Sequence, residues 1–250
     1  MKTLIIDVGN SRVGAAVHDD AEPGSWRVLG RWLHSRNGGG FEPSPWVGID
    51  FDRWVVGSVH ALGARLAREL SSRAPGTFFG RGDQFPVRCA VRSPERVGVD
   101  RLAACLAAFE LGERREAIVV DLGTAITVDW IDGQGEFQGG AIVPGWRLCA
   151  LVLHEHTSRL PRVERSDEGS PLPGRDTVEA IDRGLSIGVV AMVESLVSSL
   201  LCSAGIDPSL WVTGGDGAWF ERQTRLSPRV DPDLVFKGLR LGGLRKESGT

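Results

Sequence analysis

Two aspartates, Asp7 and Asp121, are placed to hold a cation beside phosphate groups. Each ends a short apolar run, is followed two residues later by glycine, and then by a short hydroxyl or amide side chain. A carboxylate at a strand end can hold a cation that bridges phosphates. The glycine lets backbone N–H groups approach a phosphate closely, and a hydroxyl can donate to its oxygens. The pattern predicts two phosphate-binding turns.

The two turns have closely similar sequences. The first is Asp7-Val8-Gly9-Asn10-Ser11, which continues into Arg12-Val13-Gly14, and the second is Asp121-Leu122-Gly123-Thr124-Ala125. A second apolar run follows each, so each copy predicts two buried strands joined by a tight hairpin. A single Asp-x-Gly after a strand is usually only a turn, but two matched copies are much less expected by chance. Two such hairpins facing each other would clamp the phosphate tail of a nucleotide.

A third segment, Trp211-Val212-Thr213-Gly214-Gly215-Asp216, is a strand that runs into a glycine turn. Its free backbone groups suit a nucleoside or its phosphates, although the segment alone is an ordinary strand end. The common nucleotide motifs are missing: there is no Gly-Lys-Ser/Thr, and Gly133-Gln134-Gly135 lacks the third glycine of a dinucleotide fingerprint. Phosphate binding therefore depends on the two Asp-x-Gly turns.

The elements that must position these turns follow an α/β pattern repeated twice. We expect strands at 3–7, 12–18, 26–34, 53–59, 117–121, 125–131 and 210–213, another strand through 140–141, and helices at 61–73, 101–111 and 178–204. The last helix is expected to break near Gly184 or Gly188. Turn-forming residues predict a hairpin at 132–135 and loops at 38–45 and 162–175. A short polar segment at 112–116 divides the chain into 1–113 and 114–250.

Composition excludes several classes of function. The net charge is −3 and there is no long basic run, so no nucleic-acid partner is expected. There is no apolar leader and no uninterrupted stretch of about 18 apolar residues, which argues against a membrane span. The four cysteines follow no zinc or redox spacing and predict reduced, mostly buried thiols in a cytoplasmic protein. His154-Glu155-His156 suggests a metal site, but its spacing points the two rings to different sides.

The chain resembles a known family through the order of its motifs. The two turns and Thr213-Gly214-Gly215 are similar to those of the acetate and sugar kinase/Hsp70/actin superfamily. Four motifs narrow the resemblance to type III pantothenate kinases. They are the two turns, the second extended through Ile126-Thr127, together with Gly98-Val99-Asp100-Arg101 and Gly139-Gly140-Ala141-Ile142-Val143-Pro144-Gly145. Smaller matches are Thr157-Ser158-Arg159-Leu160-Pro161 and Gly174-Arg175-Asp176-Thr177. The motifs extend from Asp7 to Gly215 and therefore cover most of the chain.

The resemblance implies a fold and a reaction. The fold would be two RNase H-like (actin-like ATPase) domains, an α/β architecture with the nucleotide cleft between them. The reaction would be ATP-dependent phosphorylation of pantothenate, the first step toward coenzyme A, in a cytoplasmic homodimer that uses Mg²⁺ and K⁺ or NH₄⁺. Asp100 would be the general base, and Gly98, Val99 and Arg101 would contact the substrate.

The resemblance also assigns the remaining site residues. Asp7 would support the magnesium ion, and Gly9, Asn10 and Ser11 would form the first phosphate loop. The flanking residues Val8, Arg12, Val13 and Gly14 would also bind the nucleotide. Asp121 would hold the monovalent cation, and Thr124, Gly214 and Gly215 would contact the nucleotide. Thr177 would contact the substrate near the dimer interface.

Simpler interpretations remain beside these. Asp100 could only cap the following helix, Arg101 could only form a surface ion pair, and Thr177 could be an ordinary loop residue. The family usually has threonine at Ser11, a change that keeps the hydroxyl. It often has an aromatic residue at Val91, so one wall of the substrate pocket is expected to differ. The alternative functions are another phosphotransferase or phosphohydrolase on the same fold, or a nucleotide-binding regulatory protein.

Overall fold

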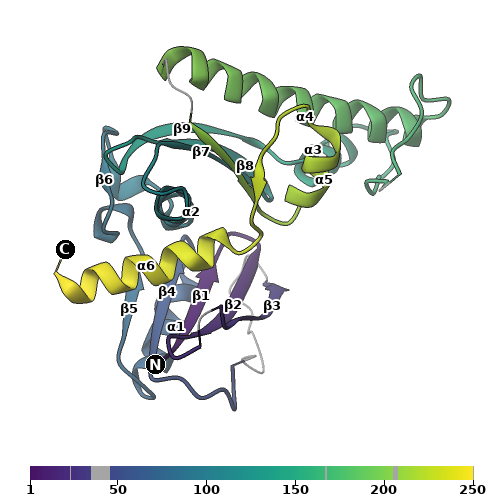
Figure 1. Cartoon of the computed structure of the whole chain (residues 1–250). Helices are drawn as coiled ribbons and strands as arrows, with labels where there is room; N and C mark the ends of the chain where they lie inside the picture. Colours follow the sequence, from purple (N-terminus) through teal and green to yellow (C-terminus); the bar gives the residue numbers. More distant parts are fainter. Residues whose placement is uncertain (23, 35–45, 167, 205–207, 250) are drawn as a thin grey trace. The chain divides into compact units, whose positions relative to one another are not determined.

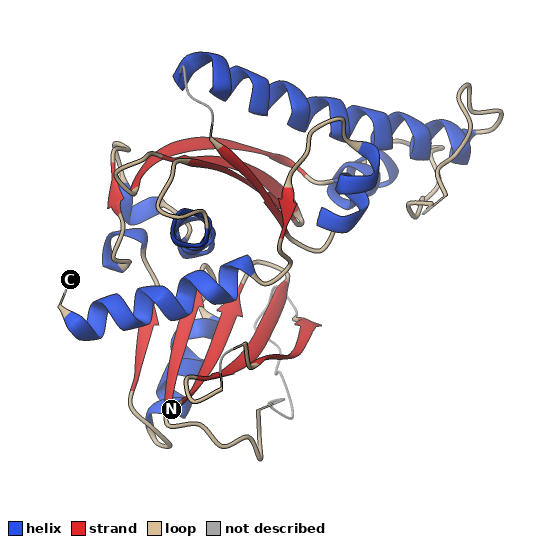
Figure 2. Cartoon of the chain, in the orientation of Figure 1, coloured by secondary structure: helices blue, strands red, loops and turns tan. Residues whose placement is uncertain are grey.

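The first sheet carries the first predicted turn at its centre. The computed structural model describes residues 1–22, 24–34, 46–166, 168–204 and 208–249. The sheet has the order β3-β2-β1-β4-β5 (Figures 1 and 2). Its strands are β1 (Lys2–Val8), β2 (Arg12–Asp19), β3 (Trp26–Leu33), β4 (Arg53–Ser58) and β5 (Gly76–Phe79). β1 is antiparallel to β2 and parallel to β4, so its carboxyl end lies beside both a hairpin and a crossover connection.

The second sheet carries the second turn and the Thr-Gly-Gly segment. Its order is β11-β10-β7-β8-β9-β6. The strands are β6 (Arg88–Cys89), β7 (Ala117–Leu122), β8 (Ala125–Ile131), β9 (Glu136–Pro144), β10 (Ser209–Thr213) and β11 (Arg229–Val230). β10 is parallel to β7, and both strands end at the same edge. The two glycine-containing segments that follow them are therefore brought together.

Helices pack on the sheets and complete two apolar cores. They are α1 (Leu62–Ser71), α2 (Val99–Leu111), α3 (Trp146–Glu155), α4 (Thr177–Ala204), α5 (Gly217–Gln223) and α6 (Leu234–Ser248), with short 3₁₀ turns η1 (Gly82–Gln84) and η2 (Pro94–Arg96). One core joins β1, β2, β4 and α1 around Ile6 and Leu66. The other joins β7, β8, α3 and α4 around Val120, Trp146 and Val193.

The chain forms two compact units. Unit 1 contains Met1–Arg115, Ile131–Gly139 and Asp233–Thr250, and unit 2 contains Glu116–Trp130 and Gly140–Pro232. The division by sequence at residues 113 and 114 falls two residues from the first unit boundary. The predicted half 114–250 differs from unit 2 because 131–139 and 233–250 group with unit 1. In the second of these segments, α6 packs on α2, β1 and β4 (Figure 1).

Glycines allow α6 to lie close to its neighbours. A Cβ on Gly238 would fall 1.8 Å from the backbone oxygen of Ala103 in α2, and one on Gly57 in β4 would fall 2.3 Å from Leu239. Leu234, Phe236 and Leu239 supply the buried side chains of the helix. Such close backbone approach makes glycine the residue that fits at Gly238.

Several sequence-based expectations need correction. α4 is continuous, with no break at Gly184 or Gly188, because both glycines lie on its exposed face where they cost helix stability without forcing a bend. α2 begins at Val99 rather than at residue 101, so Asp100 lies within its first turn. All four cysteines are free, but only Cys105 is buried. The loop predicted at 38–45 lies outside the described residues.

A network of ion pairs links the end of β2 and the start of β4 to α6. Asp20 pairs with Arg240 and with Arg53, which is itself 7% exposed and also pairs with Glu247 at 2.7 Å. The hydrogen bond from Arg240 holds the pKa of Asp20 below its usual value. The neighbouring His18 has a lowered pKa because it is partly buried and lies near Arg240.

We expect acid to weaken the fold through this network. The lowered pKa of His18 means that the unfolded chain binds the proton more readily, so stability is lost as the pH falls below the ordinary value of 6.5. The Asp20 contribution is lost at lower pH, as that carboxylate is protonated below its ordinary value of 3.8. The His18→Gln variant should therefore show a smaller fall in thermal midpoint between pH 7.5 and 5 than the parent. The exposed His156→Gln variant is the control and should behave like the parent. A fall of the same size in His18→Gln and in the parent would contradict this prediction.

Candidate active site

The first Asp-x-Gly turn joins β1 to β2 as a tight hairpin. Asp7 is half-buried at the end of β1 and pairs in register with Gly14. The turn closes with a hydrogen bond from the Gly9 N–H to the Arg12 carbonyl oxygen at 2.9 Å. A Cβ at Gly9 would meet only that oxygen, at 3.4 Å. Packing within the protein therefore does not require glycine at this position.

The other residues of this segment that were assigned to nucleotide binding differ in their exposure. Val8 and Val13 are fully buried in the core, so only their backbone groups could meet a nucleotide. Gly14 has a structural role, because a Cβ there would fall 2.7 Å from the ring of Phe236. Asn10 and Arg12 are exposed, and Ser11 is half-buried. These three side chains, with Asp7, can take part directly in ligand binding.

The second turn joins β7 to β8 and has the same construction. The Gly123 N–H donates to the Ala125 carbonyl oxygen at 3.1 Å, and a Cβ at Gly123 would meet that oxygen at 3.4 Å. Thr124 is exposed, and its carbonyl oxygen accepts a hydrogen bond from the Gly145 N–H at 3.0 Å. Gly145 precedes α3, so the last glycine of the 139–145 motif supports this turn.

The Thr-Gly-Gly segment lies directly against the second turn. Thr213 is the register partner of Asp121 across the parallel pair β7 and β10. Gly214 has a φ of +90°, and a Cβ there would fall 2.4 Å from Asp121 Oδ1 and 2.5 Å from the Leu122 carbonyl oxygen. The Asp216 N–H donates to that same Leu122 oxygen at 3.1 Å. Asp121, Thr213 and Gly214 are therefore neighbours, with Asp121 between the two glycine turns.

The aspartates fit cations that arrive with phosphate groups. Within the described part of the chain, no three or more His, Cys, Asp or Glu side chains gather where they could hold a metal ion. Magnesium at nucleotide sites is commonly held by one or two carboxylates, with phosphate oxygens and water completing its shell. A single carboxylate at Asp7 fits that requirement. Asp121, beside the space that a Cβ of Gly214 would fill, fits a cation held by one carboxylate and backbone oxygens.

The Gly-Val-Asp-Arg motif forms the start of α2. Gly98 is the N-cap and gives no side-chain cap, and a Cβ on it would fall 2.4 Å from Asp100 Oδ1. Glycine therefore makes room for this carboxylate. Asp100 Oδ1 accepts a hydrogen bond from the Arg101 N–H at 2.9 Å, so the carboxylate also satisfies a donor of the first helical turn. The Arg101 guanidinium lies 5.4 Å from the centre of the Phe137 ring.

Val59 connects this motif to the first turn. The Val59 N–H donates to the Val8 carbonyl oxygen at 3.0 Å, and a methyl group of Val59 would lie 3.4 Å from a Cβ on Gly98. The departure at Val91 also has a place: a Cβ on Gly139, whose φ is +102°, would lie 3.3 Å from Val91. The smaller side chain at 91 therefore adjoins the first glycine of the 139–145 motif.

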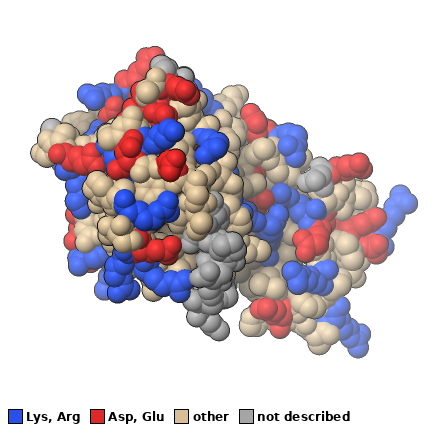
Figure 3. All heavy atoms as spheres, turned by 90° about the horizontal axis from the view of Figure 1, so that it is seen from below, with Lys and Arg blue, Asp and Glu red and all other residues tan. Residues whose placement is uncertain are grey.

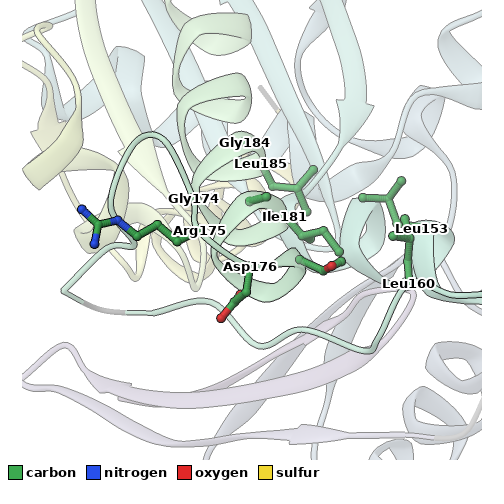
Figure 4. Close-up of a pocket in the computed structure, with 10 residues that line it drawn as sticks. Leu153, Leu160, Gly174, Arg175, Asp176, Ile181, Gly184 and Leu185 are labelled. Carbon is green, nitrogen blue, oxygen red and sulfur yellow. The ribbon is translucent and has the colours of Figure 1, made fainter.

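Thr177 begins α4 beside an open, largely apolar pocket. The pocket has a volume of about 600 Å³, and Leu153, Leu160, Ile181 and Leu185 supply its apolar lining. Figure 4 shows these leucine and isoleucine side chains near the helix, while Arg175 extends away from them. The chain before α4 is held by hydrogen bonds of Glu179 with the Arg175 and Asp176 segment. His154 lies nearby, and its Nδ1 donates to the Leu160 carbonyl oxygen at 2.9 Å.

Two contacts of the site were not predicted from the sequence. His34 Nε2 lies 2.9 Å from the Gly9 carbonyl oxygen of the first turn. Arg165, from the loop before α4, pairs with Asp216 at 2.9 Å and lies 4.3 Å from the centre of the Trp219 ring. Neither residue belongs to a recognisable motif, and each acts on a segment far away in the sequence.

Comparison with known proteins identifies the family. The sequence model of the type III pantothenate kinases matches residues 3–199. The chain belongs to the type III pantothenate kinase family. A relative of that name from Alkalilimnicola ehrlichii is 34% identical, over 98% of this chain and 98% of its own length. The match includes both Asp-x-Gly turns, the Asp100 motif and Thr177, and confirms the resemblance.

Solved structures show the same fold at low sequence identity. A putative Baf family transcriptional activator from Campylobacter jejuni is 21% identical with a TM-score of 0.59, covering 98% of both chains. A ROK hexokinase from Thermus thermophilus is 14% identical with a TM-score of 0.51, covering 99% of this chain and all of its own. The α/β architecture of this type III pantothenate kinase is therefore that of the actin-like ATPases.

The charged side chains of this family member are mixed on the visible surface. Figure 3 shows Lys and Arg interspersed with Asp and Glu over the face that it displays. Such mixing gives no extended field of one sign on that face.

Proposed function

We propose that this chain phosphorylates pantothenate with ATP, the first step of coenzyme A biosynthesis, and that Asp100 is the general base. Membership in the type III pantothenate kinase family is the observation that supports this reaction, because the match spans most of the chain. The role of Asp100 is supported by its geometry. It is half-buried in the first turn of α2, and Gly98 leaves space beside its carboxylate.

In the proposed reaction, Asp100 takes the proton of the pantothenate hydroxyl. The hydroxyl oxygen forms a bond to the γ-phosphorus of ATP, the bond to the bridging oxygen of ADP breaks, and ADP leaves with its electron pair. Asp100 must lie within about 2.6–3.2 Å of the hydroxyl, directly or through one water. Its Oδ1 is engaged by the Arg101 N–H, and this bond fixes the side-chain orientation. Arg101, as a permanent cation, would bind polar groups of the substrate.

Positioning and charge neutralisation supply most of the remaining catalysis. We propose that the backbone around Gly9 and Gly123 and the hydroxyls of Ser11 and Thr124 contact phosphates. The support is that neither glycine is needed for packing, since the nearest group to a Cβ is a carbonyl oxygen at 3.4 Å in each case. Gly214 and Gly215 would contact the nucleotide beside Asp121. Magnesium, when bound with ATP, would neutralise phosphate charge, and Asp7 is the side chain proposed to hold it.

Asp121 is proposed to hold a monovalent cation, and this assignment gives a testable requirement. We expect activity to need K⁺ or NH₄⁺ in addition to Mg²⁺, and Asp121→Asn to weaken that dependence. Asparagine keeps the size of the side chain but removes the charge that attracts the cation. Initial rates measured across a series of K⁺ concentrations at constant ionic strength would show the change. Full activity of the parent in sodium-only buffer would contradict the proposal.

α4 is proposed to form the interface of a homodimer. Ile187 is 41% exposed, and Gly184 and Gly188 on the same side of the helix have open space where a side chain would be. Among the described residues this helix also has the length and composition of a membrane span, over Thr177–Cys202, with 22% of its most apolar window buried. We propose that a second copy covers this face in a cytoplasmic enzyme with no membrane or nucleic-acid partner. Thr177, at the start of the helix, would then contact substrate near the interface.

A charge placed on the exposed face of α4 should separate the dimer. We expect a dimer with a largely apolar interface at micromolar concentration, and a monomer for Ile187→Glu, because association would bury an unpaired carboxylate. Sedimentation velocity measures both states. Ala218→Glu, which adds the same charge to an exposed position of α5, is the control and should remain dimeric. A parent that sediments as a fully active monomer would overturn the interface.

An assay of ADP release separates the proposed function from its alternatives. The kinase requires pantothenate for rapid ADP release. A phosphohydrolase would release ADP at the same rate with and without pantothenate. A kinase for another alcohol would show no increase in ADP release when pantothenate is added. A regulatory nucleotide-binding protein would bind ATP without releasing ADP at all. Only a large pantothenate-dependent rate supports the proposal.

A further inference from the structure

His34 contacts the first turn at two points. It follows the last residue of β3, and its Nε2 lies 2.9 Å from the Gly9 carbonyl oxygen. Its backbone N–H donates to the Ser11 carbonyl oxygen at 3.2 Å. Because a carbonyl oxygen can only accept, the ring must carry its hydrogen on Nε2 in this bond. One residue therefore engages two carbonyl oxygens of the Gly9-Asn10-Ser11 loop.

These bonds determine where the loop can present its donors. A trans peptide unit is planar, and its C=O and N–H point in opposite directions. The Gly9 carbonyl and the Asn10 N–H belong to the same unit. When His34 holds the Gly9 oxygen, the Asn10 N–H is directed away from the histidine. The Gly9 N–H is already engaged with Arg12 at 2.9 Å, so the Asn10 N–H is the donor whose direction His34 controls.

A second histidine supports the ring of His34. The ring centres of His34 and His60 lie 4.7 Å apart with an interplanar angle of 55°. His60 is itself oriented, because its Nδ1 accepts a hydrogen bond from the Leu62 N–H at 3.2 Å. The neighbouring Ser58 hydroxyl donates to the His60 carbonyl oxygen at 2.6 Å and accepts from the His60 N–H at 3.0 Å. The connection between β4 and α1 therefore holds His60 against His34.

We infer that His34 is a positioning residue for ATP binding, which aims the Asn10 N–H of the first turn at a nucleotide phosphate. The inference rests on the proposed phosphate-binding role of this turn. His34 touches no reacting atom. Its removal should leave the turn in place but let the peptide between Gly9 and Asn10 rotate, so the donor is no longer preorganised.

The test compares two replacements of His34. Phenylalanine keeps a ring against His60 but cannot donate, whereas the terminal amide of glutamine can donate from nearly the same place as Nε2. We expect His34→Phe to raise the Kd of a non-hydrolysable ATP analogue with Mg²⁺, and the KM for ATP, by roughly tenfold, the order of one lost hydrogen bond. His34→Gln should stay within about threefold of the parent for both constants. The KM for pantothenate and the thermal midpoint should be unchanged in both variants.

The controls separate this role from a structural one. Exposed His156→Phe, at the end of α3, should leave every constant unchanged. The inference is wrong if His34→Phe binds the analogue as tightly as the parent, or if glutamine fails to restore binding. It is also wrong if all constants change together with the thermal midpoint. The nucleotide-binding measurement needs no pantothenate, so a failure of the proposed reaction would be seen separately, as a parent that binds the analogue but has no pantothenate-dependent turnover.

Discussion

Replacing Asp100 with asparagine is expected to lower kcat by about 10²–10⁴-fold, the usual cost of losing a general base. Asparagine keeps the size of the side chain, and its amide oxygen can still accept the Arg101 N–H that Asp100 accepts at 2.9 Å. Folding and ATP binding should therefore be nearly unchanged. Steady-state kinetics with both substrates, together with a thermal melt, measure the two effects separately.

A matched variant tests whether the loss of any nearby carboxylate would lower kcat in the same way. Glu95→Gln removes a carboxylate from η2, a few residues earlier on the exposed surface, and should leave kcat unchanged. If Asp100→Asn turns over pantothenate within threefold of the parent, Asp100 serves only the first turn of α2. The proposed mechanism would then need another base.

Replacing Gly214 with alanine is expected to damage both the fold and the nucleotide site. A residue with a side chain at φ +90° is strained by about 1–2 kcal/mol. Crowding of the new Cβ against Asp121 Oδ1 and the Leu122 carbonyl oxygen should add about 1–3 kcal/mol. The midpoint of thermal unfolding should fall by roughly 5–15 °C. Displacement of Asp121 should also raise the KM for ATP and weaken the response to K⁺.

Gly133→Ala is the control for this substitution. Gly133 lies in the turn between β8 and β9, a Cβ added there would have no other atom within 4 Å, and its φ lies outside the left-handed range. Its replacement should change neither the thermal midpoint nor the KM for ATP. A Gly214→Ala protein that matched the parent in both would show that the close packing between the two glycine turns has no role in the site.

The hairpins of the site were predictable because their signals are local. Short apolar runs with β-branched residues end in Asp-x-Gly, and the structure has β1 to β2 and β7 to β8 at nearly the expected bounds. The neighbourhood of Asp121 and Gly214 was not predicted; it follows from the pairing of β7 with β10, two parallel strands that end at a common edge. The family match confirmed the type of reaction that these motifs implied.

Other features depended on contacts that no local pattern records. α6 contains three glycines and was not predicted from the sequence. The glycine at position 238 is explained only by its close contact with the backbone of Ala103 in α2. The packing of α6 also groups the last residues of the chain with unit 1, although these residues follow unit 2 in the sequence. α4 is unbroken because its glycines lie on an exposed face, and a pattern of residue types does not show which face that is. The partner of His34 is a backbone carbonyl oxygen. Every residue has such an oxygen, so no pattern of residue types indicates this contact.

The most direct test of this account is to identify the product made by the unmodified protein. The purified chain is incubated with ATP, Mg²⁺, K⁺ and pantothenate, and the pantothenate is examined by mass spectrometry and ³¹P NMR. We predict that one phosphoryl group is transferred to the pantothenate hydroxyl, with one ADP formed for each molecule phosphorylated. Unchanged pantothenate, with ATP either intact or hydrolysed to ADP and inorganic phosphate, would contradict the account.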